Sequence, residues 1–270
     1  MKKQEWTESK IARYLSEGRG SGELENYKPW IISQNFASKG RNHRPKSWKT
    51  NRKMDLFSDL EWSYMYLLDW ADNVIDIREQ YPLERELTTK IAEKKNISHS
   101  LDRKNGTPIV MTTDMLITVK DNNKLKYIAR TVKPSEELNN LRTIEKFEIE
   151  REYWEEQGIN WGIVTEKDIP TVLWQNIRDI HSCFSLNSEE LLWTEYLYRD
   201  LMVAEGSVLR NLDFFDRKYR LEDGSGLKFY KFLLARKFIN VDMLQSIDFR
   251  TDVKNLTFTK NVFQEGENLG

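Results

Sequence analysis

An acid and a lysine on two neighbouring predicted strands have the types and the spacing of a nuclease site. Asp114 lies in the middle of the first strand, and Lys133 ends the second. If the two strands are adjacent in a sheet, these side chains can meet at one sheet edge. A metal-dependent phosphodiester nuclease needs this pair, because the carboxylate holds a divalent metal and the cation offsets charge on the strained phosphate. The pair alone is a weak signal, since such spacings arise by chance.

The residues just before the lysine depart from the usual pattern of such a site. Nucleases of the PD-(D/E)xK type carry an acid two residues before the lysine, whereas this chain has Thr131 there. Thr131 and Lys133 face the same side of the strand because side chains alternate, and Val132 between them can offer its backbone carbonyl to a metal. If these residues have no catalytic function, Asp114 is a solvated or arginine-paired acid at a strand edge. Lys133 would then be a surface cation before a proline turn.

A second acid, Glu61, lies in the first turn of a predicted helix that runs to about residue 70. Ser58 and Glu61 have the spacing of a capping box, in which the glutamate only stabilises the helix start. Alternatively, Glu61 is a carboxylate ligand to a metal. The spacing favours the cap, because capping boxes are common at helix starts.

The densest charge feature is the segment 39–53, which holds seven cations and no acid. Such a segment suits contact with nucleic-acid phosphates, where affinity comes from the release of counterions. The alternative is a solvated basic loop. The predicted DNA-binding residues are Lys39, Arg41, Arg44, Lys46, Lys49, Arg52 and Lys53.

Composition limits the classes of protein that fit the chain. Of 270 residues, 39% are hydrophobic and 31% charged, which supports a packed core and argues against wholesale disorder. The net charge of −1 means that affinity for nucleic acid must come from local clusters. One cysteine excludes an internal disulfide framework, and the three histidines lack zinc-ligand spacing. With no signal peptide and no run that could cross a bilayer, we expect a cytoplasmic protein with no membrane partner.

The elements around these residues predict an α/β domain over residues 1–168. Apolar periodicity predicts helices over 7–17, 58–70 and 134–157 and strands over 73–78, 109–119, 124–133 and 159–164. Pro82 is expected to end the pairing of the first strand. The segment 84–106 is expected to be largely irregular, with weak helical character around 87–93. The last strand follows a long helix, so we expect it to pair in parallel with the same sheet.

Residues 169–270 are predicted to form a second, mainly helical domain. Helices are expected over 171–182, 188–205 and 227–238, with a loop over 211–226 and short strands over 247–250 and 256–259. Helices followed by a short hairpin indicate a winged-helix-like domain. Its basic helix, with Lys228 and Lys237, could bind either DNA or protein.

Several stretches together resemble the TnsA endonuclease subunits of heteromeric cut-and-paste transposons. The match runs in order from about residue 10 to 165 and is specific. The stretches are Glu17–Gly20, Tyr27–Trp30, Ser58–Glu61, Asp76–Leu83, Thr113–Asp114, Val132–Pro134 and parts of 145–154. The resemblance implies a restriction-endonuclease-like core, a central mixed sheet flanked by helices, in the first domain.

The resemblance also implies a catalytic site. Glu61, Asp114 and Lys133 would be catalytic, and Glu61, Asp114, Thr131 and Val132 would surround the metal. The implied cofactor is Mg²⁺, with two ions per site, for which Mn²⁺ could substitute. Relatives with glutamine in place of Thr131 use that residue near the metal. The shorter threonine hydroxyl would more readily hold a water there than ligate the metal itself.

The implied function is metal-dependent hydrolysis of phosphodiester bonds at the 5′ ends of a transposon. The implied partners are transposon-end DNA, a DDE transposase that cuts the 3′ ends, and an AAA+ ATPase regulator that docks on the C-terminal domain. Two alternatives remain open. One is a free-standing restriction or repair nuclease, and the other is a DNA-binding adaptor whose nuclease site has decayed.

Overall fold

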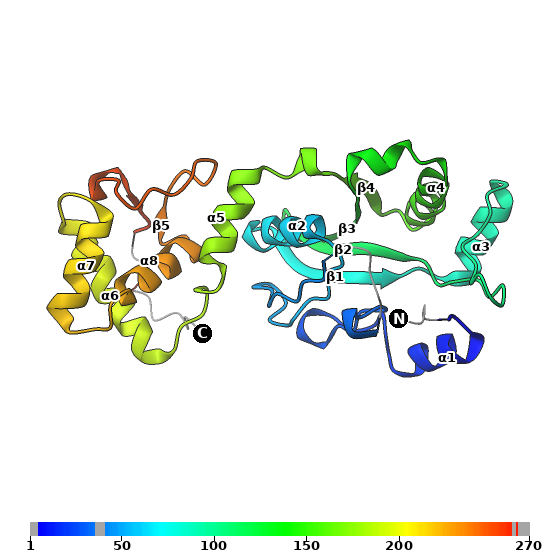
Figure 1. Ribbon diagram of the computed structural model, residues 1–270, viewed down its shortest axis with the longest axis horizontal. Coiled ribbons are helices and arrows are strands. Elements are labelled where there is room, and N and C mark those ends of the chain that lie inside the picture. The colour runs from blue at the N-terminus through cyan, green and yellow to red at the C-terminus, as the bar shows by residue number, and fades with distance from the viewer. Residues whose placement is uncertain (1–4, 36–40, 261–262, 264–270) are drawn as a thin grey trace. The chain divides into compact units, whose positions relative to one another are not determined.

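The computed structural model describes residues 5–35, 41–260 and 263. The chain divides into two compact units, an N-terminal unit, Met1–Ile169, and a C-terminal unit, Pro170–Gly270 (Figure 1). The division lies within the six-residue stretch 165–170, where the composition of the sequence changes. Within the described residues, no helix has the length and apolar character needed to cross a membrane.

The N-terminal unit is built on a four-stranded mixed sheet with the order β1-β2-β3-β4. The strands are β1 (Val74–Pro82), β2 (Thr112–Asp121), β3 (Lys124–Val132) and β4 (Asn160–Val164). The first three are antiparallel neighbours, and β4 pairs in parallel with β3, as predicted. Asn122 and Asn123 close the β2–β3 hairpin with φ angles of 48° and 61°, which asparagine tolerates better than most residues.

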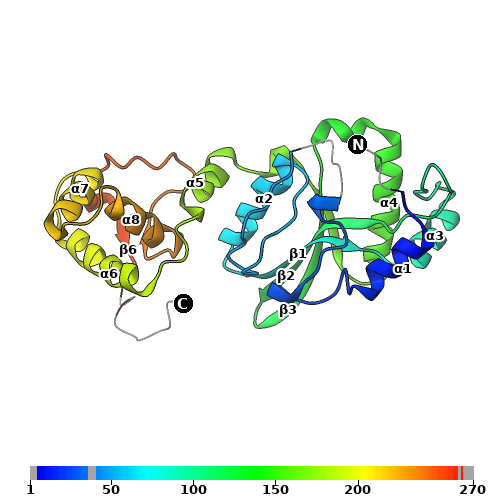
Figure 2. The same ribbon diagram turned by 60° about the horizontal axis from the view of Figure 1, so that its bottom comes forward.

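Helices flank this sheet, which confirms the predicted α/β architecture. They are α1 (Glu8–Ser16), α2 (Asp59–Trp70), α3 (Arg85–Lys94) and α4 (Leu141–Glu156). Helices α3 and α4 lie side by side (Figure 2) and share one apolar core with the sheet residues Leu116 and Ala129. A second cluster joins α1 to Trp6, Trp30 and Val110, with the two indole rings stacked 6.3 Å apart.

Two local predictions in this unit were wrong, and one strand end was predicted correctly. The long helix begins at Leu141 rather than near Pro134, because Asn140 caps it by accepting hydrogen bonds from two backbone N–H groups. Strand β1 ends at Pro82, as predicted, although it continues beyond the predicted Arg78. Pro82 itself still pairs with Thr112, which an edge strand permits because no second neighbour needs its missing N–H. Within 84–106, helix α3 forms because Ile91 and Ala92 are buried in the shared core.

The C-terminal unit is mainly helical. Its elements are α5 (Thr171–His181), α6 (Ser188–Val203), α7 (Val208–Tyr219), α8 (Ser225–Ala235) and a two-stranded antiparallel ribbon of β5 (Ile239–Asn240) and β6 (Thr257–Phe258). The predicted loop over 211–226 is wrong, since α7 occupies most of it. Leu212 and Phe215 are buried, while Phe214 and charged residues such as Arg217 lie on the exposed side. The ribbon pairs β6 with β5 and not with residues 247–250, so that predicted strand was also wrong.

Candidate active site

The first turn of α2 fixes the carboxylate of Glu61. The Ser58 hydroxyl accepts from the backbone N–H of Glu61 at 3.1 Å and donates to its Oε1 at 2.9 Å. The backbone N–H of Phe57 donates to Oε2 at 2.9 Å. The capping interaction predicted from the spacing is therefore present. Glu61 is nevertheless only 6% exposed, which a carboxylate that merely caps a surface helix does not require.

Burial and a second acid act together on Glu61. Burial raises the pKa of its carboxyl group to about 8, and the charge of Asp114 adds to this rise. The charge of Lys133 opposes the rise in pKa. Glu61 on a helix, Asp114 on a strand and Lys133 after another strand are therefore close enough to affect one another electrostatically. The structure brings these three predicted residues together.

Asp114 occupies the place where strands β2 and β3 separate. The β2–β3 register runs from Asp121 back to Met115. Beyond it, the Asp114 carboxylate accepts the backbone N–H of Val132 at 2.8 Å. A side chain thus takes the role that a strand carbonyl has elsewhere in the sheet. Burial raises the pKa of Asp114, while the Val132 hydrogen bond and the charge of Lys133 oppose the rise.

Gln80 is a neighbour of Asp114 that was not predicted from the sequence. Its Nε2 donates to Asp114 Oδ1 at 3.3 Å, and its Oε1 accepts from the Thr112 hydroxyl at 3.3 Å. Gln80 has a φ of 49°, an uncommon backbone conformation inside a strand. The sequence carries no local signal for this conformation, because glutamine does not favour it.

Lys133 follows directly on β3 and is held by the sheet. Its backbone N–H donates to the carbonyl of Val164 at 2.9 Å, which continues the pairing of β3 with β4 beyond the end of the strand. The rigid backbone at this point limits the positions that the ammonium group can reach. Its charge lowers the pKa of both carboxyl groups, so a cation near the acids is built into this end of the sheet.

Thr131 is buried and is engaged on the side of α4. Its hydroxyl donates a short hydrogen bond to Glu150 and accepts from Trp161 Nε1 at 3.3 Å. Glu150 also accepts from the Thr113 hydroxyl at 2.6 Å, and Trp154 Nε1 donates to that same hydroxyl at 2.7 Å. Glu150 thereby connects the ends of β2 and β3 to α4.

Glu150 is an acid beside the site that was also not predicted as a site residue. Burial raises its pKa to about 7, and the charge of Asp114 contributes to the rise. A signal was present in the sequence. Glu150 follows Phe147 by three residues and precedes Trp154 by four, so it shares the buried face of the helix rather than the charged one.

The donor set fits a divalent cation. Glu61 and Asp114 are two shielded carboxylates that repel one another, and a cation relieves such repulsion. Hard cations prefer oxygen ligands of this type, and Val132 adds a backbone carbonyl nearby. Among the described residues, no three His, Cys, Asp or Glu side chains cluster as a metal site. Glu150 therefore does not complete a three-acid set with Glu61 and Asp114.

The basic segment forms an irregular hairpin. Lys46 pairs with Lys53, and His43 pairs with Leu56, in antiparallel bridges. Asp69 holds the turn, accepting from the Ser47 hydroxyl at 2.7 Å and from a backbone N–H at 2.9 Å. Four of the predicted DNA-binding cations are exposed, namely Arg41, Arg44, Lys46 and Lys53. Lys49 is half-buried, and Lys39 lies outside the described residues.

Arg44 pairs with Asp55 at 3.3 Å but stays exposed, whereas Arg52 is largely buried. Its guanidinium group forms an ion pair with Glu79, with Nη1 2.7 Å from Oε1, and it donates to the carbonyls of Ile77 and Leu24 at 2.8 and 3.0 Å. The Glu79 side chain is fully buried. Arg52 thus ties the hairpin to β1, and its donors are used within the protein.

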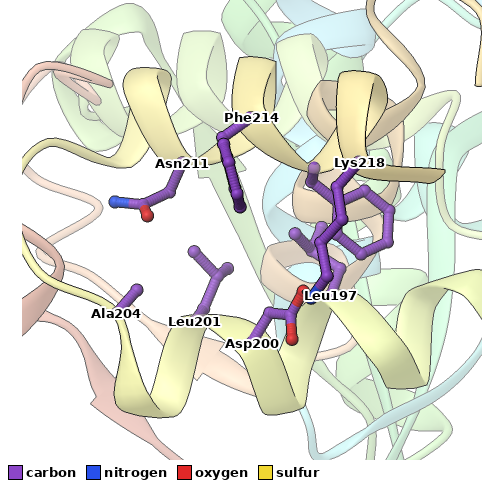
Figure 3. Close-up of a pocket in the computed structure, with 8 residues that line it drawn as sticks. Leu197, Asp200, Leu201, Ala204, Asn211, Phe214 and Lys218 are labelled. Carbon is purple, nitrogen blue, oxygen red and sulfur yellow. Dashed lines mark hydrogen bonds and ion pairs between the residues drawn. The ribbon is translucent and has the colours of Figure 1, made fainter. Parts of the chain in front are cut away.

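The C-terminal unit has a pocket of about 210 Å³ between α6 and α7 (Figure 3). Leu201 and Phe214 form part of its apolar wall. The charges at its edge, Asp200 and Lys218, pair with one another at 2.8 Å. The pocket therefore offers an apolar surface more than a set of reactive groups.

Comparison with known proteins agrees with the geometry of the N-terminal unit. The family described as "TnsA-like endonuclease N terminal" matches residues 71–166, which include Asp114 and Lys133. The transposon Tn7 transposition protein TnsA of Escherichia coli is 37% identical over 244 residues, which cover 89% of this chain and 88% of that protein. The chain belongs to the TnsA family of transposon endonucleases.

Proposed function

We propose that this endonuclease hydrolyses the phosphodiester bonds at the 5′ ends of a transposon and that a divalent metal held by Glu61 and Asp114 is required. The observation that carries the proposal is the meeting of two shielded carboxylates with Lys133 where β2 and β3 separate. Two shielded acids held beside a lysine destabilise the folded protein, and such groups with perturbed pKa values are typical of functional sites.

Each residue of the site has a proposed task. The carboxylates of Glu61 and Asp114 and the carbonyl of Val132 would hold Mg²⁺ or Mn²⁺. A bound ion of this kind supplies Lewis-acid activation of the phosphodiester. Lys133 stabilises the extra negative charge that develops on the phosphate. Gln80 orients Asp114 through its 3.3 Å hydrogen bond.

We assign Thr131 a positioning task rather than direct ligation. Its hydroxyl is already shared between Glu150 and Trp161. Through Glu150 it is also connected to Thr113 on β2. These hydrogen bonds fix the separation of the two strand ends, and that separation lets Asp114 reach the N–H of Val132.

The remaining proposals concern DNA and partners. The exposed cations Arg41, Arg44, Lys46 and Lys53 would contact the phosphates of transposon-end DNA. A separate DDE transposase would cut the 3′ ends. An AAA+ ATPase regulator would dock on the winged-helix-like domain, residues 169–270, where Met202 and Phe214 expose apolar surface. The similarity to a transposition protein of Escherichia coli supports this arrangement.

Metal binding tests the proposed site directly. Mn²⁺ titrated calorimetrically into the purified chain should bind the wild type and fail to bind Asp114→Asn. In crystals, its anomalous signal should lie among Glu61, Asp114 and the carbonyl of Val132. Asp59→Asn is the matched control, because Asp59 lies in the same helical turn as Glu61 but has a 70% exposed side chain. Equal Mn²⁺ binding by wild type and Asp114→Asn would contradict the proposal.

A further inference from the structure

A row of charged residues on α4 leads away from the carboxylate pair. Arg142, Lys146 and Glu150 are spaced four residues apart, so they lie on one side of the helix with about 6 Å between successive positions. Glu150 marks the inner end of this row because it bonds to Thr131 at the end of β3. Lys146 therefore lies one turn from the site, towards the start of α4.

A second segment joins this row. The Arg142 guanidinium donates to the carbonyl of Ser98 at 2.6 Å, which fastens the start of α4 to the chain that follows α3. That chain continues into a tight turn, in which the Asp102 carboxylate accepts the backbone N–H of Lys104 at 2.9 Å. Arg103 is exposed within this turn.

The cations in this area differ in whether they have acidic partners. Most basic residues of the α3–α4 layer are paired, as Lys94 is with Glu152 at 3.0 Å and Lys95 with Glu148 at 2.8 Å. Within the described residues, no acid forms an ion pair with Lys146, and the same is true of Arg103 and Lys133. These three cations are therefore available to bind an anion from another molecule.

Electrostatics show that these cations are near one another. Desolvation lowers the pKa of Lys146, and repulsion from Arg142, Lys133 and Arg103 lowers it further. Uncompensated like charges held together in this way favour binding of an anion. A nucleic-acid strand, which carries one charge per about 3.4 Å of axis, presents several phosphates to such a group of cations.

We propose that Lys146 and Arg103 bind the backbone phosphates immediately beside the scissile one and so set the position of the cut strand over Lys133. The inference rests on the proposed location of the active site at Glu61, Asp114 and Lys133. It adds a path for the DNA along the first half of α4, separate from the basic hairpin. Lys146 and Arg103 are positioning residues, since they touch phosphates that do not react.

The test uses the full-length chain with its transposase and a linear duplex that carries one transposon end. The rate of 5′-strand cleavage is measured at several KCl concentrations for wild type, Lys146→Gln and Arg103→Gln. Each variant should cleave about 10-fold more slowly. Each should also show a shallower dependence of log rate on log salt, by about 0.9, because one phosphate is no longer neutralised. Lys146→Arg should restore the rate, and Lys94→Gln is the matched control.

Neutral methylphosphonates placed one at a time beside the cut identify the phosphate concerned. One such position should slow the wild type but leave Lys146→Gln no slower than it already is. Wild-type rates and salt dependence in both glutamine variants would overturn the inference. Asp114→Asn, measured in the same assay, separates failure of the proposed DNA path along α4 from failure of the proposed active site. If Asp114→Asn cleaves normally, the active-site proposal fails, whereas wild-type behaviour of Lys146→Gln alone removes only the strand path.

Discussion

Replacing Glu61 with glutamine should remove a pH-dependent loss of stability from the metal-free protein. Glu61 is 6% exposed, and burial with the charge of Asp114 raises its pKa from 4.5 to about 8. At a pH between these two pKa values, the carboxyl group of Glu61 is ionised in the unfolded chain and still protonated in the folded protein. The wild type therefore loses stability as the pH rises. Glutamine does not ionise, so the variant escapes this loss.

The magnitude follows from the two pKa values. Between pH 5 and pH 8, linkage predicts that the free energy of unfolding of the wild type falls by about 3–4 kcal/mol relative to Glu61→Gln. The comparison across pH is more informative than the stability at one pH. Glutamine cannot accept from both Ser58 and Phe57 as the carboxylate does, and this fixed loss cancels when only the change with pH is compared.

Urea unfolding followed by tryptophan fluorescence measures this difference. Seven of the nine tryptophans lie in the N-terminal unit, so the signal reports mainly on the part that holds Glu61. The samples contain a chelator. Glu93→Gln, the same substitution at an exposed position of α3, serves as the control because an exposed carboxyl group predicts a wild-type pH profile. Mn²⁺ should reduce the loss at high pH, since it binds only the ionised carboxylate. Parallel pH profiles for wild type and Glu61→Gln would refute the reasoning.

Three further predictions follow from the geometry. Arg52→Ala leaves the buried Glu79 unpaired and should lower the free energy of unfolding by about 3–5 kcal/mol in urea, whereas Lys53→Ala should change it by less than about 0.5 kcal/mol. Thr131→Val should cost about 1–3 kcal/mol in the same assay but keep Mn²⁺ binding in calorimetry, and loss of Mn²⁺ binding would instead make Thr131 a ligand. Lys46→Gln combined with Lys53→Gln should make the salt dependence of DNA cleavage shallower by about 1.8, and an unchanged slope would exclude this hairpin from the DNA path.

Local sequence patterns were sufficient for part of the site. Asp114 and Lys133 lie on strands whose hairpin turn and alternation are encoded within a few residues, so their placement at one sheet edge could be predicted. Glu61 was ambiguous because its capping role is local, while its approach to Asp114 depends on how α2 packs on the sheet. The structure shows that one side chain makes the cap and also lies beside the second acid.

Other features depend on contacts between distant segments and could not be read in the same way. Arg52 looked like its neighbours in a basic run, and only the buried Glu79, far away in the sequence, distinguishes it. Helix α7 was taken for a loop although it buries Val208, Leu212 and Phe215, because apolar Phe214 and charged residues alternate with these on its exposed side. The spacing of Glu150 places it on the buried face of α4, but the threonines that it binds lie on strands far away in the sequence, so its place beside the site could not be predicted.

Strand-specific cleavage at marked transposon ends tests the central claim most directly. The two strands of each end carry different labels, and wild type, Glu61→Ala, Asp114→Ala and Lys133→Ala are each combined with the transposase, the ATPase regulator and Mg²⁺. We predict that every variant loses cleavage of the 5′ strand while cleavage of the 3′ strand by the transposase continues. Retention of 5′-strand cleavage by Asp114→Ala would contradict the account and favour a DNA-binding adaptor. Robust site-specific cleavage by the wild-type chain without the transposase would also contradict the account, because it is the behaviour expected of a free-standing nuclease.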